Sequence, residues 1–404
     1  MKINAVESLN TSSNTSLDNL DNLNNLDREL FPKSLQDLLV QLHTEFEPRR
    51  RALLAARKTK QAEYDAGQVP TFLTGHPGKT TSWQVAAIPA DLLDRRVEIT
   101  GPISSAKMVI NMLSENQDGD MACTAMLDFE DSMAPTWDNV QAGIRNLIGV
   151  AHKNLTFTQG QKVYSLNPQK MALPMVRVRG LHMNEAHFMV QTQAISAGLF
   201  DLACSAFHTA KIFLADHKTP KFYIPKCEHY LEARWWNEVF QKIEQGLELP
   251  KGTLRATFLI ETLPASFQME EILYEIRERA CGLNGGRWDK IFSDIKTLRM
   301  HADRILANRS TIDMTRPWMD HYAKLLVKTC HKHGAFAMGG MSAFTPGKDP
   351  ETRQIQVDKV TADKKREVQN GHDGCWVSHP YFIAPAKAQF QKKNQLSVQL
   401  MNLK

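Results

Sequence analysis

The sequence lacks several features that mark specialised classes of protein. Among its 404 residues there is no run of about 18 or more apolar residues, so no membrane-spanning segment is expected. The first residues show no basic segment followed by an apolar core, so we expect no secretory signal and a cytoplasmic location. The formal charge is only +5 and no basic tract is interleaved with aromatic residues, which argues against nucleic acid as a partner.

Cysteine is scarce, and its spacing excludes two common roles. No two of the six cysteines form a CxxC pair or share a metal-ligand spacing, so we expect reduced and mostly buried thiols. The chain also has no GxGxxG motif, the fingerprint that would favour a dinucleotide-binding sheet. The six positions are Cys123, Cys204, Cys227, Cys281, Cys330 and Cys375.

The N-terminal part of the chain changes character near residue 29. Asn, Ser, Asp and Leu dominate residues 1–28, which contain no aromatic residue and are predicted to be a disordered leader. Residues 29–92 are predicted to be a small helical region, with Ser34 as the N-cap of a first helix and a second helical stretch ending at Gly67. Apolar residues of the first helix recur at helical spacing: Leu35, Leu38, Leu39, Leu42 and Phe46.

Short β-type runs then alternate with helical stretches over residues 93–385. Their number and spacing predict a (β/α)8 TIM barrel, although an open doubly wound sheet would show the same alternation. A polar hairpin around Gln-Gly-Gln is predicted as an insertion at about 152–170, between the second and third strands. The eight predicted strands are 95–101, 123–130, 174–180, 221–226, 255–261, 289–295, 334–340 and 374–380.

Acidic residues stand at the carboxyl ends of these strands, where catalytic residues of such barrels gather. Strand alternation predicts that Asp128 and Glu130 share one face and that Asp131 lies on the other. Acids that converge from several strands would form an oxygen-rich site for a hard cation. Mg²⁺ fits such a site better than Zn²⁺, because no His or Cys set stands at ligand spacing.

Each of these residues also has a purely structural interpretation. A single acid at a strand end is more often a helix cap or an ion-pair partner, and we assign Asp131 to a capping role. For Asp128 and Glu130 both interpretations stay open, whereas Glu261 ends the apolar run "TFLI" and is harder to explain structurally. Arg177 and Arg179 flank Val178 and share a face of the predicted strand. One of them could be a structural partner for the acids, so at most one needs to be catalytic. The glycine-rich stretch 281–292 is interpreted, on glycine content alone, as a plain turn rather than an anion-binding loop.

Several long segments, in this order, together resemble malate synthase of the shorter A type. The resemblance runs from about residue 30 to the C-terminus, and the combination is far more specific than any single motif. The segments are "DRRVEITGP", "MLDFEDSMAPTWDN", "VRVRGLH", "ATFLIETLPASFQMEEIL", "GLNGGRWDKIFSDIKTL", "KTCHKHGAFAMGGMSAF" and "NGHDGCWVSHP".

This resemblance implies a TIM barrel with an N-terminal helical clasp and a Mg²⁺-dependent acyltransferase. The implied reaction is the Claisen condensation of acetyl-CoA with glyoxylate, followed by hydrolysis to malate and CoA, as in the glyoxylate bypass. Glu261 and Asp289 would be the metal ligands, and Arg177 would stabilise the developing enolate and alkoxide. Asp128 and Glu130 would hold metal-bound water and Arg177. The implied glyoxylate contacts are Arg177, Glu261, Gly286, Arg287, Trp288 and Asp289, and Ser132 and Pro380 are weaker candidates for the CoA channel.

The chain also departs from the family pattern. Arg279 and Lys290 stand where the family usually has His and Tyr, both expected beside the site. Residues 386–404 resemble the start of a C-terminal domain that caps the barrel and supplies the general base, so we expect the base to lie outside this chain. The alternatives are a barrel that binds Mg²⁺ and glyoxylate without turnover, and a related CoA-ester lyase. Family members of this type are often monomeric, so a monomer is expected.

Overall fold

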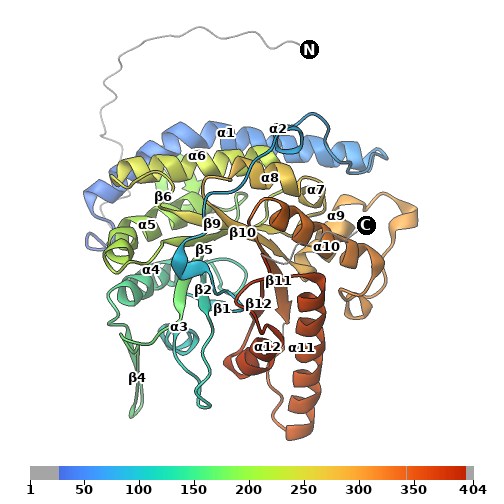
Figure 1. The fold of residues 1–404 in the computed structure, drawn as a ribbon. Helices are drawn as coiled ribbons and strands as arrows, with labels where there is room; N and C mark the ends of the chain where they lie inside the picture. Colours follow the sequence, from blue (N-terminus) through green and yellow to red (C-terminus); the bar gives the residue numbers. More distant parts are fainter. Residues whose placement is uncertain (1–26, 343, 397–404) are drawn as a thin grey trace, which may run out of the picture.

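The computed structural model describes residues 27–342 and 344–396, so the leader predicted over 1–28 lies almost wholly outside the described residues. Eight parallel strands close into a barrel in which each strand pairs with the next along the chain and β12 returns to β1 (Figure 1). This closure confirms the (β/α)8 barrel and excludes the open sheet. The strands are β1 (Val97–Pro102), β2 (Thr124–Asp128), β5 (Leu173–Arg177), β8 (Lys221–Ile224), β9 (Arg255–Ile260), β10 (Ala280–Gly285), β11 (Phe336–Ser342) and β12 (Gly374–Val377).

Helices surround this barrel, and two antiparallel hairpins decorate it. The first hairpin, β3 (Thr156–Gln159) with β4 (Lys162–Ser165), confirms the predicted β insertion, whereas β6 (Asn184–Val190) with β7 (Gln193–Ser196) had no predicted counterpart. No helix in the described parts of the chain is long and apolar enough to cross a membrane. The helices after α1 are α2 (Pro77–Thr80), α3 (Ala106–Leu113), α4 (Trp137–Ala151), α5 (Ala197–Ala215), α6 (Tyr230–Gly246), α7 (Leu263–Ser266), α8 (Met269–Glu275), α9 (Arg287–Thr297), α10 (Pro317–Lys332), α11 (Pro350–Asn370) and α12 (Ile383–Gln389).

The N-terminal helical region is built on one long helix. Residues predicted to form two helices belong to α1 (Lys33–Asp65), which continues through Pro48 and lies across α5 and α6 (Figure 1). The prediction that Ser34 caps this helix is wrong, because the N-cap position is Pro32. The predicted apolar face is correct: Leu35, Leu39 and Leu42 are fully buried. Burial of this face against the barrel helices stabilises the helix more than its local caps do.

The sixth barrel strand is not where the sequence predicted it. Residues 289–295 lie in α9, and the strand is β10, inside the glycine-rich stretch that was interpreted as a turn. Glycine is required here by close packing, since a Cβ on Gly282 would lie 2.3 Å from the carbonyl oxygen of Phe336 on β11. The segment is therefore a buried strand with little side-chain volume, a case that strand propensity scores poorly.

The barrel interior is filled by alternate residues of the strands. Met126, Met175, Tyr223, Leu259 and Trp376 form one buried cluster, while their neighbours along each strand pack outward against the helices. A network of buried hydrogen bonds lies in the same interior and stabilises the charges of Arg95 and Glu98 there. Arg95 donates to Glu98 at 2.8 Å and to the Tyr223 hydroxyl at 2.7 Å, and the Trp376 indole donates to Glu98 at 3.0 Å.

Replacing Gly282 with alanine tests the close approach of β10 and β11. The added Cβ would force the strands apart, and we expect a loss of about 1–3 kcal/mol in the free energy of unfolding. Gly285→Ala is the matched control in the same strand, because its Cβ would meet nothing nearer than 3.5 Å. Urea unfolding followed by circular dichroism measures both variants, and equal losses in the two would contradict this account of β10.

Candidate active site

Three charged residues continue the inward-facing columns of the barrel at its carboxyl end. Asp128, Arg177 and Glu261 each stand two residues beyond an interior apolar residue, namely Met126, Met175 and Leu259. Because side chains alternate along a strand, this spacing turns all three side chains into the barrel mouth. All three are buried, so the strands deliver two carboxylates and a guanidinium to one place.

Arg177 and Asp128 form a two-pronged ion pair at the centre of this mouth. The Nε and Nη2 atoms of Arg177 donate to the two oxygens of Asp128 at 2.7 Å and 2.6 Å. Asp128 also accepts bonds from the backbone N–H groups of Glu130 and Ser132 and from the Ser132 hydroxyl. Burial opposes ionisation of Asp128, but the Arg177 charge outweighs it and lowers the pKa of the carboxyl. The bonding capacity of Asp128 is used up, so its role is to fix Arg177.

Glu130 lies close to Asp128 but, unlike Asp128, it lacks hydrogen-bond partners in the described part of the chain. Both of its carboxylate oxygens are buried and accept no hydrogen bond from the described residues, although the Arg177 Nη1 atom lies 3.5 Å away. Burial raises the pKa of Glu130 well above its usual range. An unsatisfied buried carboxylate is costly unless a ligand or water completes it. Glu130 therefore keeps acceptor oxygens that a ligand or a water molecule would satisfy.

Lys226 lies among four carboxylates. Its Nζ atom is 3.0 Å from Asp289, 3.1 Å from Asp131, 3.5 Å from Glu261 and 3.7 Å from Glu130. Burial disfavours the ammonium, but these acids, Glu261 foremost, raise the pKa of Lys226 above its ordinary value. Lys226 ends the predicted strand 221–226, but its charge had no predicted role at the site.

The backbone at Lys226 is unusual and firmly held. Its φ of 56° lies in the left-handed region, which is rare for a residue other than glycine and often occurs at functional sites. Its N–H donates to Glu261 at 2.8 Å, and its carbonyl accepts from Arg57 of α1 at 2.8 Å. Arg57 also pairs with Glu232 of α6. The N-terminal helix therefore directly supports the turn that carries Lys226.

The start of α9 completes the site beside Glu261. Gly286 is its N-cap residue, and a Cβ there would lie 3.0 Å from the Glu261 Cβ, so glycine allows this helix to reach the carboxylate. Asp289 lies in the first turn, where the N-terminal end of the helix dipole favours negative charge. The Tyr322 hydroxyl accepts from the Gly286 N–H at 3.2 Å and donates to the carbonyl of Ile260, which ties α9 to the end of β9.

The donor set suits a hard divalent cation bound largely by substrate and water. Glu261 and Asp289 lie 3.5 Å and 3.0 Å from the same point, the Nζ atom of Lys226. Burial raises the pKa of Glu261 to about 7; Lys226 opposes this shift and Asp289 adds to it. In the described residues no group of three or more His, Cys, Asp or Glu side chains is gathered to hold a metal. Two carboxylates with open positions fit Mg²⁺, which keeps several waters, better than they fit a closed zinc site. The unsatisfied oxygens of Glu130 fit the same conclusion.

Two sequence predictions near the site are wrong. Asp131 does not cap a helix: Thr136 caps α4, and Asp131 lies 3.3 Å from Arg177 and 3.1 Å from Lys226. Arg279 does not lie beside the site, because it precedes β10 at the opposite end of the strand and pairs with Glu244 of α6. A residue that begins a strand of a parallel barrel lies at the end opposite the mouth. A correct boundary for β10 would have placed Arg279 at that opposite end.

The remaining predicted residues are dispersed around the mouth. Lys290 is buried, pairs with Asp294 and lies 5.5 Å from the Tyr322 ring. Trp288 is about half exposed, with Arg309 stacked over it at 4.6 Å. The Ser132 hydroxyl donates a hydrogen bond to Asp128. Pro380 lines a separate cavity of about 600 Å³ at the ends of β1 and β12. Arg179 pairs with Asp201 and Glu185 instead of the acids of the mouth, so its role is structural.

A barrel whose strand ends gather carboxylates around an arginine and a lysine is typical of enzymes that act on small anionic substrates with a divalent cation. The sequence profile described as "Malate synthase, TIM barrel domain" matches residues 173–402, and that described as "Malate synthase, N-terminal domain" matches residues 18–76. The chain belongs to the malate synthase family. This membership confirms the predicted acyltransferase of the malate synthase type.

Individual relatives agree with this assignment. Malate synthase A of Escherichia coli (strain K12) is 46% identical over 379 residues, which cover 92% of this chain and 70% of that protein. Malate synthase of Myxococcus xanthus (strain DK1622) is 46% identical, covering 91% of this chain and 68% of its own length. Among solved structures, the Haloferax volcanii malate synthase lead(II) complex has a TM-score of 0.53 at 17% identity and covers 74% of this chain and 73% of its own, a likeness of fold alone.

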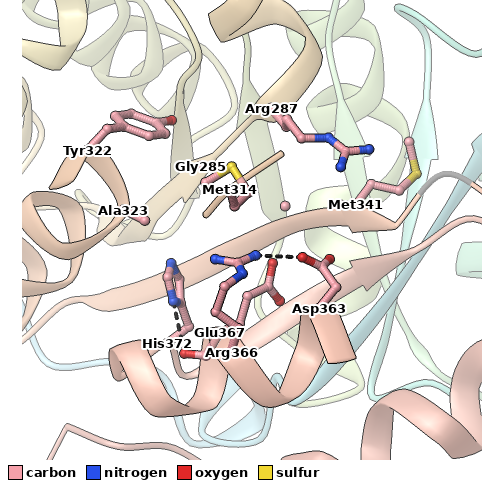
Figure 2. A pocket seen from close by; sticks show the side chains of 11 residues that line it. Gly285, Arg287, Met314, Tyr322, Ala323, Met341, Asp363, Arg366, Glu367 and His372 are labelled. Carbon is pink, nitrogen blue, oxygen red and sulfur yellow. Dashed lines mark hydrogen bonds and ion pairs between the residues drawn. The ribbon is translucent and has the colours of Figure 1, made fainter. Parts of the chain in front are cut away.

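A small enclosed cavity lies behind the α9 loop, between β10, β11, α10 and α11. Figure 2 shows Gly285, Arg287 and Tyr322 on one side of it, with Asp363, Arg366, Glu367 and His372 on the other. Its volume is about 20 Å³, enough for one water. Glu367 is buried, and its carboxylate packs so closely over Gly339 that a Cβ there would lie 2.4 Å away. Burial raises the pKa of Glu367 to about 7, although Lys364, 3.2 Å away, opposes the shift.

This raised pKa predicts a pH-dependent stability. The ordinary carboxyl value is 4.5, so the folded protein holds the Glu367 proton more tightly than the unfolded chain does. The stabilisation is present below about pH 4.5 and is lost as pH rises towards and through about 7. Glu367→Gln, which carries no titrating proton, should lose less melting temperature than the wild type between pH 5 and pH 8. Differential scanning calorimetry at both values measures this, and identical pH profiles would contradict it.

Proposed function

We propose that the mouth of this barrel is the Mg²⁺ and glyoxylate site of a malate synthase. The observation that carries the proposal is the bracket formed by Glu261 and Asp289, beside the fixed guanidinium of Arg177 and the unsatisfied carboxylate of Glu130. Glu261 and Asp289 would hold the cation. A bound Mg²⁺ would supply Lewis-acid polarisation of the glyoxylate aldehyde and neutralise developing negative charge.

The residues of this chain supply the remaining electrostatics. Arg177 keeps its charge at every physiological pH, because the acids around it raise its pKa despite burial. Its Nη1 atom is not used by Asp128 and lies 3.5 Å from Glu130 and 3.3 Å from Asp131. In the proposed reaction this atom would donate to the enolate oxygen of the acetyl thioester. A preorganised donor of this kind needs no reorganisation as charge develops. Asp128 acts as a positioning residue, since it fixes the plane of the guanidinium.

Glyoxylate contacts are proposed for the α9 N-terminus. Free backbone N–H groups at a helix N-terminus bind carboxylates well, and Arg287 and Trp288 begin α9 next to Asp289. Acetyl-CoA would enter from the side of Pro380, whose cavity also includes Lys162 and Tyr164 of the β insertion. A direct contact of Ser132 with CoA stays a prediction. So do the cytoplasmic location and the monomeric state.

Calorimetric titration of glyoxylate, with and without Mg²⁺, tests the proposed site directly. We expect binding to the wild type only when Mg²⁺ is present and loss of that binding in Glu261→Gln, because one of two protein ligands is removed. Glu228→Gln is the matched control: it removes a nearby carboxylate that pairs with Arg57 and Lys296 instead of the cluster. Unchanged Mg²⁺-dependent glyoxylate binding in Glu261→Gln would overturn the assignment.

Arg177→Lys tests whether the charge of this side chain or its fixed orientation matters for the reaction. An ammonium cannot span both oxygens of Asp128, so Arg177→Lys keeps the charge but loses the fixed orientation. We expect free thiol release from acetyl-CoA, measured with glyoxylate and saturating Mg²⁺, to fall by about 10²–10³ relative to the wild type. Glyoxylate affinity should change much less. A rate within a few-fold of wild type would show that the orientation of Arg177 is unimportant.

A further inference from the structure

The proposed metal position already has a cation next to it, the ammonium of Lys226. Its Nζ atom lies within 3.5 Å of both Glu261 and Asp289, the two carboxylates that would hold the metal. It is also near Asp131 and Glu130, so it is the group that these four acids share. Arg177 also contacts Glu130 and Asp131, but two of its nitrogens are occupied by Asp128, and in the described residues it forms no ion pair with Glu261 or Asp289. Lys226 therefore supplies the main positive charge beside Glu261 and Asp289.

The way Lys226 is held separates its backbone from its side chain. The N–H is bound by Glu261 and the carbonyl by Arg57, so the turn is fixed at both polar atoms. The side chain is 20% exposed, and its flexible four-carbon stem can swing the ammonium towards Asp131, which is 46% exposed at the rim. The ammonium can consequently leave the bracket while the backbone that orients Glu261 stays in place.

We propose that Lys226 is a built-in counter-ion for the metal site, which neutralises Glu261 and Asp289 in the metal-free protein and moves aside when a divalent cation binds. The inference rests on the proposed function, since it assumes that these two residues hold Mg²⁺. Two cations cannot share the same carboxylate oxygens at 3–4 Å without strong repulsion. Lys226 therefore keeps the acids together before the metal arrives and weakens metal binding by the work needed to displace it.

Lys226→Met tests this, because methionine keeps most of the stem length and the backbone contacts but removes the charge. Calorimetric titration with MgCl₂ alone should show affinity at least about tenfold tighter than in the wild type, the change expected from removing a full charge at this distance. In EDTA the variant should unfold at a lower temperature than the wild type, and added Mg²⁺ should raise its melting temperature by more. Lys296→Met is the control: that lysine is nearby and pairs with Glu228.

The outcomes separate this inference from the function beneath it. Wild-type protein that binds Mg²⁺ neither alone nor together with glyoxylate would overturn the proposed function. Wild-type protein that binds Mg²⁺, with Lys226→Met binding equally or more weakly, would overturn the counter-ion role alone. If Lys226→Met does not fold in EDTA, Lys226→Met combined with Glu130→Gln lowers the excess negative charge. That double variant should bind Mg²⁺ more tightly than Glu130→Gln alone, and equal affinities would overturn the inference.

Discussion

The site depends on one electrostatic constraint: among the described residues, more carboxylates than side-chain cations meet at the barrel mouth. Five carboxylates converge there, and in this part of the chain two cations, Arg177 and Lys226, contact them; the acids are Asp128, Glu130, Asp131, Glu261 and Asp289. A buried charge without a partner is strongly destabilising, so this excess depends on Arg177, which Asp128 fixes, and on Lys226, whose backbone is held by Glu261 and Arg57. The proposed divalent metal would supply the positive charge that these two side chains do not.

Asp128 and Glu130 show how local bonding divides the work between two neighbouring acids. They are two residues apart and both are buried, yet one is saturated by five hydrogen bonds and the other has none from the described residues. The first has a lowered pKa and fixes the arginine, and the second has a raised pKa and keeps acceptor oxygens unpartnered within the described residues. Environment rather than residue type therefore decides which carboxylate is structural and which is available for chemistry.

Much of this could be predicted from the sequence, for identifiable reasons. Alternation along β2, β5 and β9 predicts that Asp128, Arg177 and Glu261 face inward, because each follows an interior apolar residue by two positions. The segment 280–285 could not be recognised as a strand, since its glycines follow from contacts with a strand more than 50 residues away. Lys226 ends a predicted strand, but its contacts with the acids were not predictable, because a left-handed backbone breaks the alternation on which the prediction relied.

The contact between α1 and the Lys226 turn has a consequence for the order of folding. Arg57 contacts Lys226 and Glu232, which lie 169 and 175 residues further along the chain. During synthesis α1 emerges early, but Lys226 and Glu232 of α6 emerge only after more than half of these 404 residues have been made. Contacts of such long sequence separation form late, since loop closure must precede them. The turn beside the proposed metal site should therefore be among the last parts of the barrel to become native.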